Sequence, residues 1–247
     1  MPRAARTKSE SGYYHILLRG ISRQNIFEDD EDCYRFLKTL KRYKTELGFE
    51  IHSYCLMGNH VHLLFKDTKD QLDLIMKKIA GSYAYYFNQK YDRVGHLFQD
   101  RFKSEAIDDD NYFLTVIRYI HQNPQKAKIA QVSKYKWSSY SEFIRNPIII
   151  DRTFTLELLG GVEKFIEFIN NEEDENKCLE ISDYNNMTDK KAKELLLREY
   201  DISSFFDIPK LSLKERNSII RSLKDNGLSI RQLARLTGLN RGVIQKA

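Results

Sequence analysis

Residues 57–65 read Met57-Gly58-Asn59-His60-Val61-His62-Leu63-Leu64-Phe65, a short turn followed by an apolar run of β-strand character. Side chains of a strand alternate between its two faces, so we expect His60 and His62 on one face and Val61 on the other. Two imidazoles side by side supply half of a metal site. Histidines also occur in strands as packing or hydrogen-bonding residues, so the pair alone does not decide between the two interpretations.

Strand and helix patterns alternate on both sides of this stretch. Strand patterns cover residues 13–19, 49–57, 60–65 and 102–107. Helical patterns cover residues 30–48, 72–91 and 108–122. The dipeptide Gly58-Asn59 predicts a hairpin, and Pro124 predicts the end of the last of these helices. The order β-α-β-β-α-β-α favours an α+β fold: a ferredoxin-like antiparallel sheet with helices on one face and one added helix.

Charge divides the chain into three segments. The net charge is +5 over 247 residues, but residues 1–145 carry +6, residues 146–210 carry −7 and residues 211–247 carry +6. Two basic segments on either side of an acidic one indicate two modules that face a polyanion and a connector between them. We therefore expect domains at 1–145 and 211–247 joined by an acidic helical connector at 146–210, with residues 172–176 as an exposed hinge.

The last 37 residues have the signals of three short helices. Ser212 to Glu215 and Ser229 to Gln232 are capping boxes, and Gly227 is a natural helix stop. Thr237-Gly238-Leu239 predicts a turn, after which Asn240 caps a last helix. Short helices around a glycine-bearing turn in a basic segment predict an all-α helix-turn-helix, in which candidate DNA contacts are Arg231, Asn240 and Arg241. Three helices that pack against a protein partner would differ mainly in charge.

Cysteine use and hydropathy bound the cellular location. The three cysteines, Cys33, Cys55 and Cys178, are odd in number and form no CxxC motif, which is typical of a reducing compartment. No apolar run is long enough for a membrane span, and the first residues lack the apolar core of a signal peptide. We expect a cytoplasmic protein without a membrane partner.

A second group of candidate residues lies on the helical pattern that follows residue 108. Tyr119 and Asn123 are four positions apart, so their side chains share one helical face. Asn123 can offer an amide oxygen as a third metal ligand, and Tyr119 can present a phenolate beside it. An asparagine before a proline is also common at helix ends, and Tyr119 is one of 15 tyrosines, most of which serve packing.

Several motifs in order along residues 1–145 resemble one known family. They are Tyr14-His15-Ile16, His60-Val61-His62, Gly95-His96-Leu97-Phe98-Gln99-Asp100-Arg101-Phe102-Lys103, Arg118-Tyr119-Ile120-His121-Gln122-Asn123-Pro124 and Trp137-Ser138-Ser139-Tyr140. Together they resemble the single-tyrosine HUH transposases, in particular the REP-associated tyrosine transposase branch. The terminal helix-turn-helix matches an appendage of some members.

The resemblance implies a role for each matching residue. His60, His62 and Asn123 would hold a divalent ion, Mg²⁺ or Mn²⁺, and Tyr119 would be the nucleophile. The implied activity is single-strand DNA cleavage and strand transfer through a 5′-phosphotyrosine, on hairpin or repeat DNA. Basic residues beside the site are candidate phosphate contacts: Arg101, Lys103 and Arg118. No Walker-type GxxxxGK[ST] loop is present, which agrees with a reaction that exchanges phosphodiesters without nucleotide hydrolysis.

Two other functions stay open at this point. A non-catalytic DNA-binding regulator would use the helix-turn-helix, with duplex DNA as its partner. For the transposase as for the regulator, a monomer and a homodimer are both open. A metal-dependent hydrolase would use water as its nucleophile and leave no protein–DNA linkage. The second is disfavoured because Asp108, Asp109 and Asp110 are better explained as residues that begin a helix than as a carboxylate cluster.

Overall fold

The computed structural model of the chain describes residues 6–171, 178, 189–226, 228 and 230–246, and these form two compact units within residues 1–179 and 180–247. The segments expected from charge do not coincide with these units. The first part of the acidic connector packs with the N-terminal unit, and its last part packs with the C-terminal helices. The apolar residues of the expected connector are thus divided between the hydrophobic cores of the two units. The expected hinge at 172–176 lies outside the described residues.

The N-terminal unit contains a four-stranded antiparallel sheet, which confirms the predicted α+β class. The strands are β1 (Tyr13–Arg19), β2 (Glu50–Met57), β3 (His60–Lys66) and β4 (Lys103–Ile107), in the order β2-β3-β1-β4. Gly58 and Asn59 form the turn between β2 and β3 as predicted, although neither adopts a positive φ. The Gly58 carbonyl accepts hydrogen bonds from the backbone N–H groups of Ile26 and Phe27, which anchors this turn to the chain after β1.

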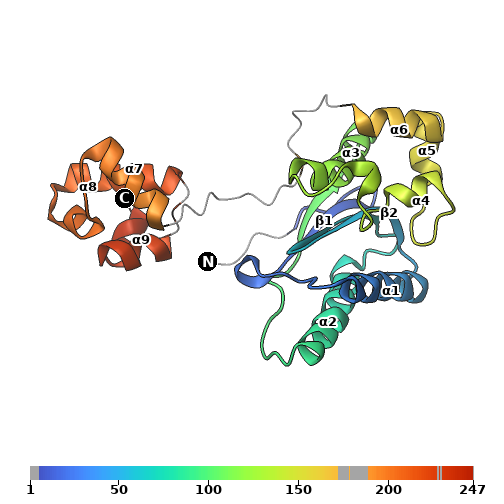
Figure 1. Cartoon of the computed structure of the whole chain (residues 1–247), viewed down its shortest axis with the longest axis horizontal. Helices are drawn as coiled ribbons and strands as arrows, with labels where there is room; N and C mark the ends of the chain where they lie inside the picture. Colours follow the sequence, from blue (N-terminus) through green and yellow to red (C-terminus); the bar gives the residue numbers. More distant parts are fainter. Residues whose placement is uncertain (1–5, 172–177, 179–188, 227, 229, 247) are drawn as a thin grey trace. The chain divides into compact units, whose positions relative to one another are not determined.

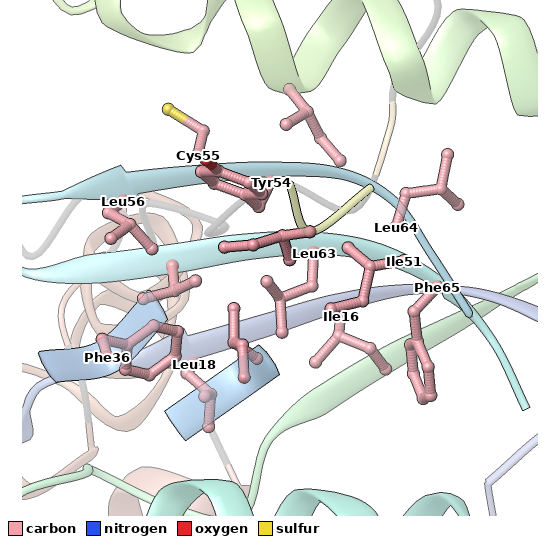
Figure 2. Packing of buried hydrophobic residues seen from close by; sticks show 14 of the residues in the cluster. Ile16, Leu18, Phe36, Ile51, Tyr54, Cys55, Leu56, Leu63, Leu64 and Phe65 are labelled. Carbon is pink, nitrogen blue, oxygen red and sulfur yellow. The ribbon is translucent and has the colours of Figure 1, made fainter. Parts of the chain in front are cut away.

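One face of the sheet is mainly apolar. Its residues come from alternate positions of β1 and β3, and all are at most 2% exposed: Ile16, Leu18, Val61, Leu63 and Phe65. The helices α1 (Asp30–Leu47) and α2 (Leu72–Lys90) cover this face, and Figure 2 shows Phe36 of α1 beside Leu18. In the same view the Cys55 side chain points to the other side of the sheet, as strand alternation requires.

The opposite face is covered by α3 (Asp110–Lys126), the added helix that the sequence places after the last strand (Figure 1). β1 runs parallel to β2, and β3 runs parallel to β4, with one strand between the members of each pair. Connections between parallel strands of one sheet cross over with the same hand, so α1 and α2 lie on the same face. α3 follows the last strand and is not bound by that rule. It covers the second face, so β2, which has helices over both of its faces, is buried at seven successive positions.

α3 also extends further than predicted. Asp109 caps its N-terminus by accepting a hydrogen bond from the Tyr112 N–H at 2.8 Å, and the helix continues through Pro124 to Lys126. Proline removes one backbone donor and disfavours helical geometry at the residue before it. Tertiary packing overrides that preference here, because Ile117, Ile120 and Pro124 are all buried. Asn123 therefore lies within a helix rather than at its end.

Three further helices complete the N-terminal unit: α4 (Tyr140–Ile144), α5 (Thr153–Leu159) and α6 (Val162–Asn170). They lie on the α3 side of the sheet (Figure 1). Phe143 and Phe165 stack with ring centroids 4.1 Å apart, and the Gln122 amide of α3 donates to the Ile169 carbonyl at 2.9 Å. These contacts hold the outer side of α3, which leaves its inner side in a defined position over the strands.

The C-terminal unit is all-α, as predicted. Its elements are α7 (Asp189–Tyr200), a 3₁₀ helix (Phe205–Lys210), α8 (Leu213–Asp225), α9 (Ile230–Thr237) and α10 (Arg241–Lys246). Ser212 and Glu215 form the predicted capping box at α8, and Gly238 has φ +73° in the turn before α10. Gly227 and Ser229, expected to stop one helix and begin the next, lie outside the described residues.

Within the part of the chain that the structure describes, no helix combines the length and the apolar character that crossing a membrane requires.

Candidate nucleophile and metal site

The two histidines of β3 lie on the sheet face that α3 covers. In the antiparallel register His60 is paired with Arg19 and His62 with Leu17, and partners in such a pair point to the same side. The imidazole centroids are 5.0 Å apart. His62 is fully buried, whereas His60 is partly exposed near the end of the strand. The pair thus runs from the interior of the unit towards its surface.

α3 places Tyr119 and Asn123 against the inner histidine. The Tyr119 ring lies edge-on to His62 with 5.4 Å between centroids, and Asn123 Nδ2 lies 3.4 Å from His62 Nε2. The four-residue spacing puts both side chains on the helical face that looks at β3. Residues far apart in the sequence therefore meet in one place, with His62 as their common neighbour.

Two residues without a predicted role hold the histidine rings. His15 on β1 is fully buried, and its Nε2 lies 3.0 Å from His62 Nδ1. Asn59 in the hairpin turn brings its Oδ1 to 2.6 Å from His60 Nδ1. Strand alternation places His15 on one face of its own strand, but only the register of β1 against β3 brings it to His62.

Burial makes the inner histidines neutral. Desolvation, with further contributions from His15 and His60, lowers the pKa of His62 well below its usual value. Desolvation also lowers the pKa of His15, although the nearby Glu105 carboxylate opposes the shift. A neutral imidazole keeps a lone pair on one ring nitrogen, which is the form that binds metals.

The side chains present fit a divalent cation held by mixed ligands. Among the described residues no three His, Cys, Asp or Glu side chains cluster closely enough to hold a metal. A site here therefore depends on an amide, as the set His60, His62 and Asn123 provides. Nitrogen and oxygen ligands of this kind suit first-row divalent ions, including Mn²⁺. To act as a ligand, Asn123 must turn its amide oxygen to the position that its nitrogen occupies beside His62.

The candidate phosphate contacts separate into two kinds. Arg101 and Lys103 are exposed, and Lys103 is paired with Leu17, so it projects from the same sheet face as the histidines. Arg118 is only 8% exposed, and its guanidinium lies 3.8 Å above the Phe168 ring. The structure thus favours a packing role for Arg118 over the predicted phosphate contact.

Lys126 is a basic residue beside the site that the sequence analysis did not predict. The Lys126 ammonium lies over the Tyr119 ring, 5.5 Å from its centroid. Lys126 is two helical turns after Tyr119, so helical spacing places the two residues on one face. The predicted end of α3 before Pro124 hid this relation, because it left Lys126 outside the helix.

The candidate DNA contacts of the C-terminal unit lie at α9 and α10. Arg231 belongs to α9, and its side chain is outside the described part of the structure. Asn240 accepts a hydrogen bond from the Gly242 N–H at 2.8 Å, so its side chain acts as the predicted cap. Arg241 is exposed at the first position of α10.

Comparison with known proteins gives the family. Residues 8–123 match the sequence profile of the IS200-like transposases, a range that ends at Asn123. A REP-associated tyrosine transposase bound to a REP hairpin is 20% identical, with a TM-score of 0.50, over 58% of this chain and 86% of that one. A candidate transposase from Deinococcus radiodurans R1 is 18% identical, with a TM-score of 0.35, over 49% and 97% respectively. No curated protein matches. Residues 8–123 of this chain therefore form an IS200-like transposase domain.

Proposed function

We propose that this transposase cuts and joins single-stranded DNA in a metal-dependent reaction with Tyr119 as its nucleophile. The observation that carries the proposal is the meeting of Tyr119 and Asn123 of α3 with His62 of β3, at 5.4 Å between ring centroids and 3.4 Å between side-chain nitrogens. A nucleophile within reach of a metal-binding group is the arrangement that phosphoryl transfer requires.

The reaction exchanges one phosphodiester for another. The Tyr119 oxygen attacks the scissile phosphorus, the bond from phosphorus to the 3′ oxygen breaks, and the leaving oxygen takes a proton to give a 3′-hydroxyl. The DNA 5′ end is then linked to Tyr119. A 3′-hydroxyl of another strand attacks this link, restores a phosphodiester and releases Tyr119. The Lys126 ammonium, 5.5 Å from the centroid of the Tyr119 ring, adds positive charge beside the proposed nucleophile.

His60, His62 and Asn123 would hold the cation, Mg²⁺ or Mn²⁺. When bound, it orients the scissile phosphate and withdraws charge from its oxygens. The protein contributes the positions of the ligands, since β3 fixes both imidazoles and α3 is held from outside by α6. Lys103 adds positive charge on the same sheet face, and Arg101 is exposed two residues before it.

Hairpin DNA is the substrate that we propose. A structure with the same fold holds a REP hairpin, which is a property of that protein and supports the same class of substrate here. A hairpin flanked by single strands offers an unpaired phosphate to the site without the cost of opening a duplex.

We also propose that the C-terminal unit binds duplex DNA as a helix-turn-helix. Residues 211–247 carry a net charge of +6, and α9 and α10 are separated by a three-residue turn with Gly238 in the left-handed region. Arg231 and Arg241 are the candidate contacts. The alternative, a regulator that binds DNA without cutting it, would use this unit alone.

Covalent trapping tests the proposed nucleophile. The probe is a pool of hairpin oligonucleotides with randomised flanks, labelled at the 3′ end in one sample and at the 5′ end in another, with Mn²⁺ present. A 5′-phosphotyrosine retains the downstream fragment, so only the 3′ label should become attached to the protein. We expect Tyr119→Phe to abolish the attachment and Tyr112→Phe, on the same helix, to retain it.

Other outcomes separate the competing functions. An adduct that persists in Tyr119→Phe removes Tyr119 as the nucleophile. Cleavage without any attached label indicates attack by water. Binding of duplex DNA without cleavage of any oligonucleotide in the pool favours the regulator. Mass spectrometry of the trapped peptide then identifies the residue that carries the DNA.

A further inference from the structure

The hydrogen bond of His60 has a defined direction. His60 Nδ1 lies 2.6 Å from Asn59 Oδ1. An amide oxygen only accepts hydrogen bonds, so the imidazole must donate and Nδ1 must carry the proton. In the neutral ring, Nε2 is then unprotonated and has its lone pair available.

The hydrogen bond of His62 has no such direction by itself. His15 Nε2 and His62 Nδ1 are 3.0 Å apart, and either nitrogen of a neutral imidazole can donate or accept. Both rings are fully buried, so bulk water does not compete for either nitrogen as a donor or an acceptor. The direction must follow from the groups at the far ends of the two rings.

Glu105 sets the polarity at the outer end. It is paired with His15 across β1 and β4, and its Oε2 lies 3.8 Å from His15 Nδ1, which is too long for a hydrogen bond but close enough for electrostatic attraction. A carboxylate facing Nδ1 stabilises the tautomer of His15 with the proton on that nitrogen. His15 Nε2 is then the acceptor, and His62 Nδ1 is the donor.

In the metal-free arrangement, before its amide turns to offer the oxygen as a ligand, Asn123 favours the same polarity at the inner end. Its amide Nδ2, which only donates, lies 3.4 Å from His62 Nε2. That contact requires a lone pair on Nε2, and therefore a proton on Nδ1. Glu105 and Asn123, at the two ends of this row of side chains, thus favour the same direction for the hydrogen bond from His62 to His15.

We propose that His15 and Asn59 are positioning residues that hold His62 and His60 in one tautomer, with Nδ1 protonated and Nε2 presented to a divalent cation. Each accepts a hydrogen bond from one ligand histidine, and Glu105 orients His15 from behind. The proposal deepens the function proposed above, because it assumes that the cation binds at His60 and His62. Hydrogen-bond partners of this kind fix ligand orientation and typically account for about 10–100-fold in metal affinity.

The tautomers are measured directly in the metal-free, full-length wild-type protein. Long-range ¹H–¹⁵N correlation spectra of protein labelled at histidine distinguish a protonated from an unprotonated ring nitrogen, and single-histidine substitutions assign the signals. We expect Nδ1 to be protonated in both His60 and His62. A proton on Nε2 of His62 would overturn the proposal, and the tautomer itself is read in the wild-type protein.

Mn²⁺ binding, followed by the electron paramagnetic resonance signal of the free ion, gives a second readout independent of DNA. His15→Phe fills the ring volume but removes the acceptor, and we expect Mn²⁺ affinity to fall about 10–100-fold. His15→Gln restores an acceptor near the position of Nε2 and should recover most of the affinity. Asn59→Leu and Asn59→Asp form the equivalent pair at His60.

His52→Phe is the matched control. His52 is another buried histidine of the same sheet, packed against Tyr13 and Phe113, and it contacts neither ligand histidine. An equal decrease of Mn²⁺ affinity in His52→Phe and His15→Phe would show a general effect of burial and overturn the proposal.

The two proposals fail separately. Expected tautomers with Mn²⁺ affinity sensitive to His15 support the positioning role even if no DNA adduct forms, in which case the proposed strand transfer is wrong. Adducts at Tyr119 together with a proton on His62 Nε2 leave the reaction in place and overturn the positioning role.

Discussion

The two faces of the sheet are built from alternate residues of the same strands and differ in what they bury. One face contributes Ile16, Val61 and Leu63, which pack against α1 and α2 and carry no polar side-chain atoms. The other contributes His15 and His62, equally buried, against α3. Burial of an apolar side chain stabilises the fold by about 1.5–3 kcal/mol, whereas a buried imidazole is tolerated only where its nitrogens find partners.

The apolar core and the proposed chemical site therefore lie on different faces of one sheet. The apolar face can exchange one hydrophobic side chain for another of similar volume at little cost. The histidine face cannot, because His62 has one nitrogen committed to His15 and the other to Asn123. Adjacent residues of one strand can consequently have opposite mutational signatures.

Leu63→Ala and His62→Ala test this contrast most strongly. We expect His62→Ala to reduce formation of the DNA adduct by more than about 100-fold, because removal of a ligand exceeds the effect of removing the residue that orients it. We expect Leu63→Ala to lower the free energy of unfolding by about 2–5 kcal/mol, because it removes buried apolar surface and leaves a residual cavity. Adduct trapping and urea denaturation of both variants measure the two effects.

Absence of the adduct in folded Leu63→Ala, measured at a temperature where that variant is native, would contradict the separation. So would normal adduct formation by His62→Ala. In either case the two faces would not divide stability from chemistry, and the role of β3 in both would need to be assigned again.

Acid should destabilise the N-terminal unit through its buried histidines and not through its apolar residues. Burial lowers the pKa of His52 below its usual value and that of His121 to about 4. The unfolded chain binds protons below about pH 6.5 that the folded chain does not, so stability present above that pH decreases as the pH falls. For His121 the decrease continues to a pH of about 4, with a limiting slope of about 1.4 kcal/mol per pH unit for each histidine.

Urea denaturation of the wild type and His52→Phe between about pH 7 and pH 5 checks the sign and the size. As the pH falls, the free energy of unfolding should decrease less steeply in the variant than in the wild type. The two slopes should differ by at most about 1.4 kcal/mol per pH unit, the contribution of one proton. A fall of equal steepness in both proteins would mean that His52 is not protonated preferentially in the unfolded chain.

The smallest expected effect concerns the exposed edge of the histidine face. Replacement of Arg101 and Lys103 by alanine should weaken binding of single-stranded DNA and lower the slope of log affinity against log salt by about 0.7 for each phosphate that is no longer neutralised. Lys77→Ala, an exposed lysine of α2 on the opposite side of the sheet, is the control and should change neither. An equal effect of Lys77→Ala would indicate non-specific attraction by net charge.

Many features of this protein follow from its local sequence. The hairpin at Gly58-Asn59, the alternation of His60 with Val61, the capping box at Ser212 and the four-residue spacing of Tyr119 and Asn123 are all short-range features, and each was predicted correctly as a structural element. Such features depend on steric and hydrogen-bonding preferences of neighbouring residues, which the sequence states directly.

The remaining features depend on tertiary packing. α3 continues through Pro124 because its buried contacts outweigh a local preference against helix, and Arg118 turns inward because Phe168 lies there. His15 meets His62, 47 residues away in the sequence, only through the register of β1 against β3. Contacts of this kind depend on how distant segments pack, and no pattern of neighbouring residues specifies which buried partners will meet.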